Sequence, residues 1–190
     1  LVEVLEHAVR AVAPGATPGQ FAQVSGVAYS YDPDLPAGDR IVSAALTDAD
    51  GHVMDVLVQD GEIVGNPDAP IRIITLNFMA DGGDGYPFKD FLDADPAFAN
   101  RVDLASEDAN ANGVLDAGED LNQNGKLDLA AAIDSGAATF AASSSEQDAL
   151  ADYIAERYSE TPYDVVDTGP EGDERIQNLN ARGDSVLDGP

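Results

Sequence analysis

A short apolar run that ends in a glycine-rich loop is the feature that most constrains the fold of this chain. Residues 71–78 read Ile-Arg-Ile-Ile-Thr-Leu-Asn-Phe, with β-branched residues dominating. A run of this length and composition, bounded by turn residues, predicts a buried strand. Gly82, Gly83 and Gly85 follow around Asp84, and glycines let the backbone take positive φ and approach a ligand closely. We therefore expect a buried strand that leads into a ligand-binding loop.

The side chains beside this loop suit a nucleoside. The Asp84 carboxylate can accept hydrogen bonds from paired hydroxyls, and Phe78, at the end of the run, can offer a flat face to a base. Spacing alone leaves an alternative open at each position, because Phe78 could be a core aromatic and Asp84 an acid that forms a turn. Together the strand, the aromatic residue, the glycines and the acid predict a nucleoside pocket.

Residues 76–87, Leu-Asn-Phe-Met-Ala-Asp-Gly-Gly-Asp-Gly-Tyr-Pro, resemble the signature of the C-terminal domain of the 5′-nucleotidase / UDP-sugar hydrolase family. An ordered series of further motifs is similar to the same family, which is more specific than one glycine loop. The resemblance covers most of the chain outside residues 93–138. The further motifs are residues 5–9, 19–26 running into 31–33, 38–42, 146–148 and 173–176.

The resemblance implies an α/β (α+β) fold, with a mixed β-sheet and packed helices, and a role in a two-domain hydrolase. In this family the C-terminal domain holds the nucleoside, while an N-terminal metallophosphoesterase domain holds two divalent metals that activate water. Matched residue by residue, Phe78 is one of two aromatics that sandwich the base, and Asp84 binds the ribose hydroxyls. The residues that shape the pocket are Asn77, Gly82, Gly83 and Gly85.

We expect no catalytic residue in this chain. In the family, the partner aromatic and the phosphate-side arginines precede the position of Leu1, and no Gly-Asn-His-Asp motif occurs in the sequence. Residues 50–52, Asp-Gly-His, match the Asp-x-His of dimetal phosphoesterases, but no second motif follows, so we interpret them as a turn. We therefore expect a longer polypeptide whose N-terminal metallophosphoesterase domain carries the two metals, and no hydrolysis by this chain alone.

Residues 108–119 fit the calcium-binding loop of an EF-hand, with side-chain oxygens at positions 1, 3, 5 and 9, glycine at 6 and glutamate at 12. A second copy starts at Asp120, but Ala131 replaces its closing glutamate, so we expect weaker Ca2+ binding there or a ligand such as Asp134. The alternative is an acidic, flexible loop with accidental Asn-Gly turns. The expected ligands are Asp108, Asn110, Asn112, Val114, Asp116 and Glu119 in the first loop, and Asp120, Asn122, Asn124, Lys126 and Asp128 in the second.

The charge balance narrows the possible partners. Nine basic residues against 36 acidic ones give a formal net charge of −27, which argues against nucleic acids and anionic membranes and suits calcium binding or a salty medium. No apolar run reaches transmembrane length, so we expect no membrane insertion. Because the calcium concentration outside cells would fill even a weak loop, we expect an extracellular or periplasmic location.

The domain boundaries follow from these motifs. We expect residues 1–92 and 139–179 to form the nucleotidase-like domain without its N-terminal part, residues 93–138 to form the calcium insert, and residues 180–190 to be a linker. The first domain should contain a helix from Leu1 to Val12, on which His7 is a partly exposed residue. Strands are expected within residues 21–31, where Val27, Tyr29 and Tyr31 alternate as on a half-buried strand, and at 41–46 and 53–58. A helix capped by residues 143–145 should bury Ala149, Leu150, Tyr153, Ile154 and Tyr158.

A second class of function remains open from the sequence. The chain could be a calcium-stabilised, non-catalytic module of a larger surface or secreted protein that keeps the nucleotidase-like fold as a scaffold. Dimetal motifs upstream in the same polypeptide would favour the hydrolase. The residues do not indicate which nucleotide is preferred, since 5′-mononucleotides, UDP-sugars, dinucleotides and 2′,3′-cyclic nucleotides all suit related proteins.

Overall fold

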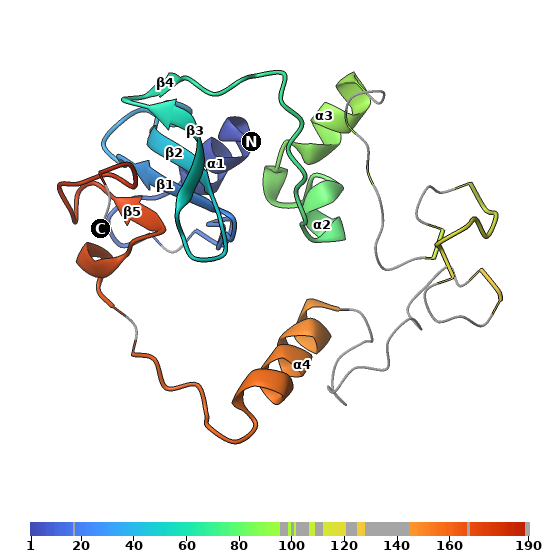
Figure 1. Ribbon diagram of the computed structural model, residues 1–190. Coiled ribbons are helices and arrows are strands. Elements are labelled where there is room, and N and C mark those ends of the chain that lie inside the picture. Colours follow the sequence, from blue (N-terminus) through green and yellow to red (C-terminus); the bar gives the residue numbers. More distant parts are fainter. Residues whose placement is uncertain are drawn as a thin grey trace. The chain divides into compact units, whose positions relative to one another are not determined.

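The computed structural model describes residues 1–16, 18–95, 99, 101, 107–108, 112–120, 125–127, 145–166 and 168–188 (Figure 1). The chain divides into two compact units, one formed by Leu1–Phe91 with Asp167–Pro190 and the other by Leu92–Val166. The helix expected after residues 143–145 therefore falls in the second unit, whereas the sequence placed it in the nucleotidase-like domain.

One mixed sheet forms the centre of the first unit. Its strands lie in the order β4-β3-β2-β1-β5, with β4 and β5 at the two edges (Figure 1). Strands β1 to β4 pair antiparallel with their chain neighbours, and β5 pairs parallel with β1. This mixed sheet with packed helices confirms the predicted α/β class. The bounds are β1 Val27–Tyr31, β2 Ile41–Thr47, β3 Val53–Gln59, β4 Glu62–Ile63 and β5 Ile176–Asn178.

Helix α1, Val2–Val9, packs on this sheet. Leu5 and Val9, one helical turn apart, are buried in a core cluster that includes Tyr29 and Tyr31 of β1. All five residues of β1 are buried, so this strand is covered on both faces and is not the half-buried strand that its alternating pattern predicted. The predicted N-terminal helix and the strands predicted within 21–31 and at 41–46 and 53–58 are confirmed.

Glu6 and Arg40 fix α1 to the start of β2. The Glu6 carboxylate accepts hydrogen bonds from the backbone N–H groups of Arg40 and Ile41, at 3.0 and 2.6 Å. The Arg40 guanidinium donates to carbonyls at the end of α1, which have no partner within the helix itself. These carbonyls belong to Val9 (2.7 Å), Arg10 (3.1 Å) and Val12 (3.0 Å), and a further bond reaches Leu35 (3.0 Å).

The strand predicted at residues 71–76 is not present, and this expectation was wrong. Residues 71–76 have no regular secondary structure, and Ile74 is 81% exposed. A β-branched composition measures only how well a segment fits a pleated, buried surface, and burial requires a neighbouring strand with which to pair. In the described part of the chain, β3 pairs on its outer side with the two-residue β4, and residues 71–76 pair with no strand of the sheet.

Residues after β5 pack against the sheet, although we expected residues 180–190 to be a linker. The buried Ser30 hydroxyl donates to Gln177 Oε1 at 2.8 Å and accepts from the backbone N–H of Val186 at 2.9 Å. The backbone N–H of Leu179 donates to the Tyr31 carbonyl at 3.0 Å. These bonds satisfy polar groups on the buried strand β1 and hold the C-terminal residues in place.

The second unit contains α4, Glu146–Tyr158. The predicted helix is confirmed, and Ser145 caps it by accepting a hydrogen bond from the Asp148 backbone N–H at 3.3 Å. Its predicted buried stripe is wrong, because Leu150, Tyr153 and Ile154 are 59%, 51% and 46% exposed. The apolar spacing specifies a helix with one apolar face but not a surface to cover that face. None of the described helices is long and apolar enough to cross a membrane.

Candidate functional site

The residues predicted to hold a nucleoside lie on a short helix and the loop that follows it. Helix α2, Asn77–Ala80, carries Phe78, and the single turn η1, Gly83–Gly85, carries Asp84. Phe78 is 55% exposed, and Asn77 and Asp84 are also exposed. The structure thus excludes the core-aromatic alternative for Phe78.

Gly83 allows the loop to contact Phe78 directly. A Cβ atom added at Gly83 would lie 2.5 Å from the Phe78 carbonyl oxygen and 2.6 Å from two ring carbons. Such distances are not found between real atoms, so a glycine is required for this contact. Gly82 and Gly85 are required for a different reason, since their φ angles are +88° and +75°.

Asp84 itself has a left-handed backbone, with φ +52°, which residues with a Cβ rarely adopt. The carbonyl oxygen of Asp84 lies 2.9 Å from His7 Nε2. His7 belongs to α1 and is only 8% exposed, so the expectation of a partly exposed helix residue was wrong. The sequence signal for this contact was that His7 lies within residues 5–9, one of the motifs that resemble the family.

Tyr86 connects the loop to a third motif. Its ring lies 4.5 Å from the His7 ring, and its hydroxyl donates to the Gln20 carbonyl at 2.5 Å. Burial, and secondarily the negative charge of Asp84, raise the pKa of the Tyr86 hydroxyl, which keeps it protonated as a donor. Motifs at residues 5–9, 19–26 and 76–87 therefore meet around Tyr86.

Phe88 and Phe91 complete the support beneath this loop. They lie on α3, Phe88–Ala94, which spans the boundary between the two units. Both pack with Val4 and Ala8 of α1 and with Tyr86. The Tyr86 and Phe88 rings stack with centroids 5.9 Å apart. The loop thus rests on an apolar base while Phe78 and Asp84 stay exposed.

A positive charge lies beside the loop. A Cβ atom at Gly85 would be 3.5 Å from Arg10 Nη2, which places this guanidinium next to the residue that follows Asp84. The chain carries nine basic residues against 36 acidic ones. A guanidinium at this position therefore offsets part of the negative field near the loop.

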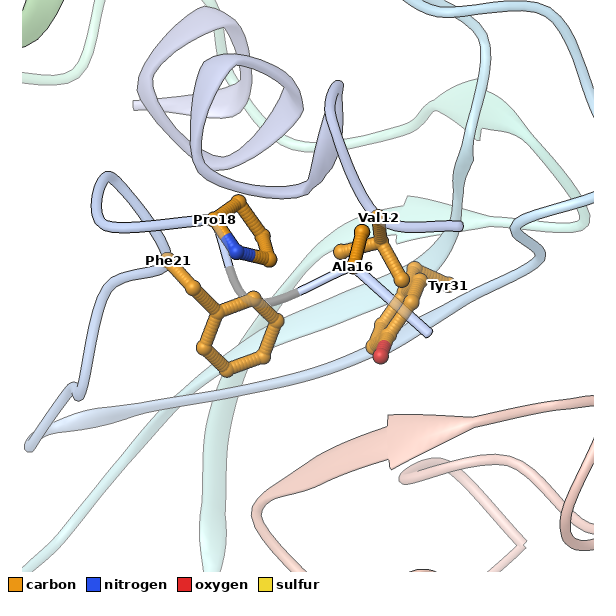
Figure 2. Close-up of a pocket in the computed structure, with 5 residues that line it drawn as sticks. All are labelled: Val12, Ala16, Pro18, Phe21 and Tyr31. Atoms are coloured by element: carbon orange, nitrogen blue, oxygen red, sulfur yellow. The ribbon is translucent and has the colours of Figure 1, made fainter. Parts of the chain in front are cut away.

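A separate apolar hollow of about 350 Å3 lies beyond the end of α1. Its lining contains none of the predicted site residues, and Figure 2 shows the ring of Phe21 facing the hollow together with Tyr31. Burial, and secondarily Asp173, raise the pKa of Tyr31. The lining residues are Val12, Ala16, Pro18, Phe21 and Tyr31.

Hydrogen bonds between side chains and the backbone link the described residues of the first predicted calcium loop. Asp108 accepts hydrogen bonds from the backbone N–H groups of Asn112 at 2.8 Å and Gly113 at 2.7 Å. The Asp116 backbone N–H donates to Glu119 Oε2 at 2.8 Å, so the carboxylates at positions 1 and 12 both turn toward the loop. Gly113 makes the turn with φ +74°. The oxygen-rich donor set suits a hard cation.

The second predicted calcium loop repeats one of these bonds. The Gly125 backbone N–H donates to Asp120 Oδ2 at 2.9 Å, which matches the bond from Gly113 to Asp108. Val114 and Lys126 occupy the positions that bind calcium through a carbonyl. The remaining predicted ligands, Asn110, Asn122, Asn124 and Asp128, lie outside the described residues, as do Ala131 and Asp134.

The Asp-Gly-His segment forms a hairpin turn between β2 and β3, as predicted. Asp48 Oδ1 accepts hydrogen bonds from the backbone N–H groups of Asp50 and His52, both at 2.9 Å, and its Oδ2 lies 3.1 Å from His52 Nδ1. Hydrogen bonds from the backbone and the side chain of His52 lower the pKa of Asp48. Among the residues placed by the structure, one group of three acidic or histidine side chains has potential metal-ligand atoms within 4.8 Å of one another. This group consists of Asp48, Asp50 and His52.

The sheet with α1 packed on it defines an α/β domain, and this domain presents an exposed aromatic beside a supported glycine loop. Residues 1–90 match the family model described as 5′-nucleotidase, C-terminal domain. This part of the chain belongs to that family, as the order of motifs predicted, and is a nucleotidase-type domain. The matched range contains α1, β1 to β4, Phe78 and Asp84. A search of curated proteins gave no match.

Proposed function

We propose that the chain is the nucleotide-binding domain of a secreted 5′-nucleotidase-type phosphohydrolase. The N-terminal metallophosphoesterase domain of the same polypeptide would supply the two divalent metals and the catalytic residues. The observation that carries the proposal is the exposed Phe78 ring held against the glycine loop that bears Asp84. The exposed ring offers a flat face on which a base can stack.

The geometry supports a division of roles within the loop. Phe78 stacks on the base, and the Asp84 carboxylate accepts hydrogen bonds from the two ribose hydroxyls. Asn77, Gly82, Gly83 and Gly85 shape the loop around them. Arg10 beside Gly85 lowers the electrostatic cost of bringing an anionic nucleotide to a chain with a net charge of −27.

Replacing Phe78 with alanine is expected to weaken AMP binding by about 1–3 kcal/mol, because a stacked base contributes roughly that much. Titration of the 190-residue chain with AMP, followed by NMR chemical shifts, measures the change. Tyr163→Ala is the matched control, since Tyr163 is a 62% exposed aromatic in the second unit. Equal affinities of Phe78→Ala and wild type would contradict the stacking role. Absence of AMP binding by the wild-type chain would favour the non-catalytic calcium module.

We also propose that the loops at 108–119 and 120–131 bind Ca2+ and stabilise the second unit, in an extracellular or periplasmic setting. The support is the set of hydrogen bonds that the Asp108 and Glu119 carboxylates accept from the backbone of the first loop, and the partial repeat of this set at Asp120. The first loop offers three carboxylates as calcium ligands, those of Asp108, Asp116 and Glu119. Calcium would supply the positive charge that lets these carboxylates face one loop.

Removing calcium is expected to lower the melting temperature. An ion that binds only the native state stabilises it by about 2.7 kcal/mol when present at about 100 times its Kd. Each kcal/mol moves the melting temperature of a domain as small as the second unit, Leu92–Val166, by roughly 4–8 °C. Addition of EGTA should therefore lower the melting temperature of this unit by about 10–20 °C, measured by circular dichroism.

Two variants separate this effect from general charge repulsion. Glu119→Gln removes the closing carboxylate and should reduce the response to EGTA, whereas Glu62→Gln, on the exposed edge strand β4, should leave it unchanged. The same melting temperature with and without EGTA would contradict calcium binding by the loops.

A further inference from the structure

We infer that His7 is a positioning residue, which holds the Asp84 backbone in the conformation that presents its carboxylate to the ribose. The inference rests on the proposed nucleoside function and names a residue on a different element from the binding loop. His7 lies on α1, 77 residues before Asp84 in the sequence. Its role is to act through Asp84, without touching the nucleoside itself.

The hydrogen bond defines the state of the imidazole. His7 Nε2 lies 2.9 Å from the Asp84 carbonyl oxygen, and a carbonyl can only accept, so Nε2 carries a proton and donates it. Asp84, which accepts this bond, is the one non-glycine residue between Gly82 and Tyr86, and its φ angle is +52°. A left-handed residue with a Cβ persists only where surrounding contacts hold it, and the bond from His7 is such a contact.

The imidazole is itself confined. Its 8% exposure leaves little room for another rotamer, and the Tyr86 ring lies 4.5 Å from it. Tyr86 is anchored in turn by its hydrogen bond to the Gln20 carbonyl. A Cβ at Gly85 would be only 3.2 Å from His7 Cε1, so the backbone of the loop also closes against the ring. A rigid donor thus fixes the position of Asp84.

The test compares two replacements of His7 in the 190-residue chain. His7→Gln keeps an N–H donor at a similar reach, whereas His7→Leu fills the space without a donor. Adenosine affinity is expected to fall about five- to tenfold in His7→Leu, as for the loss of one buried hydrogen bond, and to stay within about twofold of wild type in His7→Gln. His52→Leu, at the exposed hairpin turn, is the matched control.

A ligand that lacks the 2′- and 3′-hydroxyls isolates the positioning role. Affinity for 2′,3′-dideoxyadenosine should be the same in wild type and His7→Leu, because the Asp84 contact is absent in both. Asp84→Ala should weaken adenosine as His7→Leu does, and the double variant should weaken it no further. Equal loss for both ligands would show a purely structural role for His7 and overturn the inference.

A second measurement does not depend on binding. The backbone N–H groups of Gly85 and Tyr86 donate to Gly82 and Gly83 within the loop, so their hydrogen exchange reports its order. In His7→Leu this exchange should quicken about fivefold or more, while that of the paired residues of β2 and β3 stays constant. Unchanged exchange in the loop would overturn the inference even if nucleosides bind. If Asp84→Ala leaves adenosine affinity unaltered, the ribose contact fails, and the exchange measurement still decides whether His7 orders the loop.

Discussion

Replacing Arg40 with methionine is expected to lower the free energy of unfolding of the first unit by about 2–4 kcal/mol. The guanidinium donates to three carbonyls at and beyond the end of α1 and to a fourth in the loop before β2. Methionine keeps most of the apolar stem but donates no hydrogen bond to these carbonyls. Urea denaturation followed by far-ultraviolet circular dichroism measures the loss.

Two further arginine variants test the cause of this loss. Arg40→Lys keeps the charge but has no planar fork, so it should recover only part of the stability. Arg157→Met, on the exposed surface of α4, should change the unfolding free energy by no more than about 0.5 kcal/mol. An equally small effect of Arg40→Met would show that α1 is held by Leu5, Val9 and Glu6 without help from Arg40.

Gly83→Ala is expected to reduce AMP affinity more than about tenfold, because it displaces groups that make both proposed contacts. The added Cβ would lie 2.5 Å from the Phe78 carbonyl oxygen and 2.6 Å from its ring, so both the helix and the aromatic must move. The φ angle of Gly83 is not positive, and the effect is therefore steric and not a matter of backbone freedom. Displacement of Phe78 and of the loop bearing Asp84 would disturb both proposed contacts at once.

Gly19→Ala is the matched control for this variant. A Cβ at Gly19 meets no atom within 4 Å, and its φ is not positive either. It should therefore leave AMP affinity and the melting temperature close to their wild-type values. AMP affinity that is unchanged in Gly83→Ala would mean that the contact between the loop and Phe78 is not needed for binding.

Most residues of the proposed nucleoside site come from the sequence alone. Phe78, Asp84 and the three glycines were identified by the composition of one stretch and by its resemblance to the family, to which residues 1–90 belong. His7 was not, because a histidine on an amphipathic helix gives no local sign of a partner 77 residues away. The same limit applies to Glu6 and Arg40, whose bonds depend on how α1 meets the start of β2.

The sequence by itself determined the local elements of this protein. Apolar spacing specified α1, alternating strands and an Asp-Gly turn specified the β2–β3 hairpin, and Ser145 marked the start of α4. These features are set by interactions within a few residues, which a linear pattern records directly.

Only the tertiary structure decided which apolar surfaces are buried and which loop residues are held. The Ile71–Leu76 run and the stripe of α4 have the composition of buried elements, yet Ile74 and Leu150 are exposed. Aspartate is common in turns, and the sequence left a turn-forming role open for Asp84. In the structure, its left-handed backbone is held by a histidine from α1. Burial and positioning depend on which distant surface comes within reach, and this is fixed by the packing of the whole unit and not by local preference.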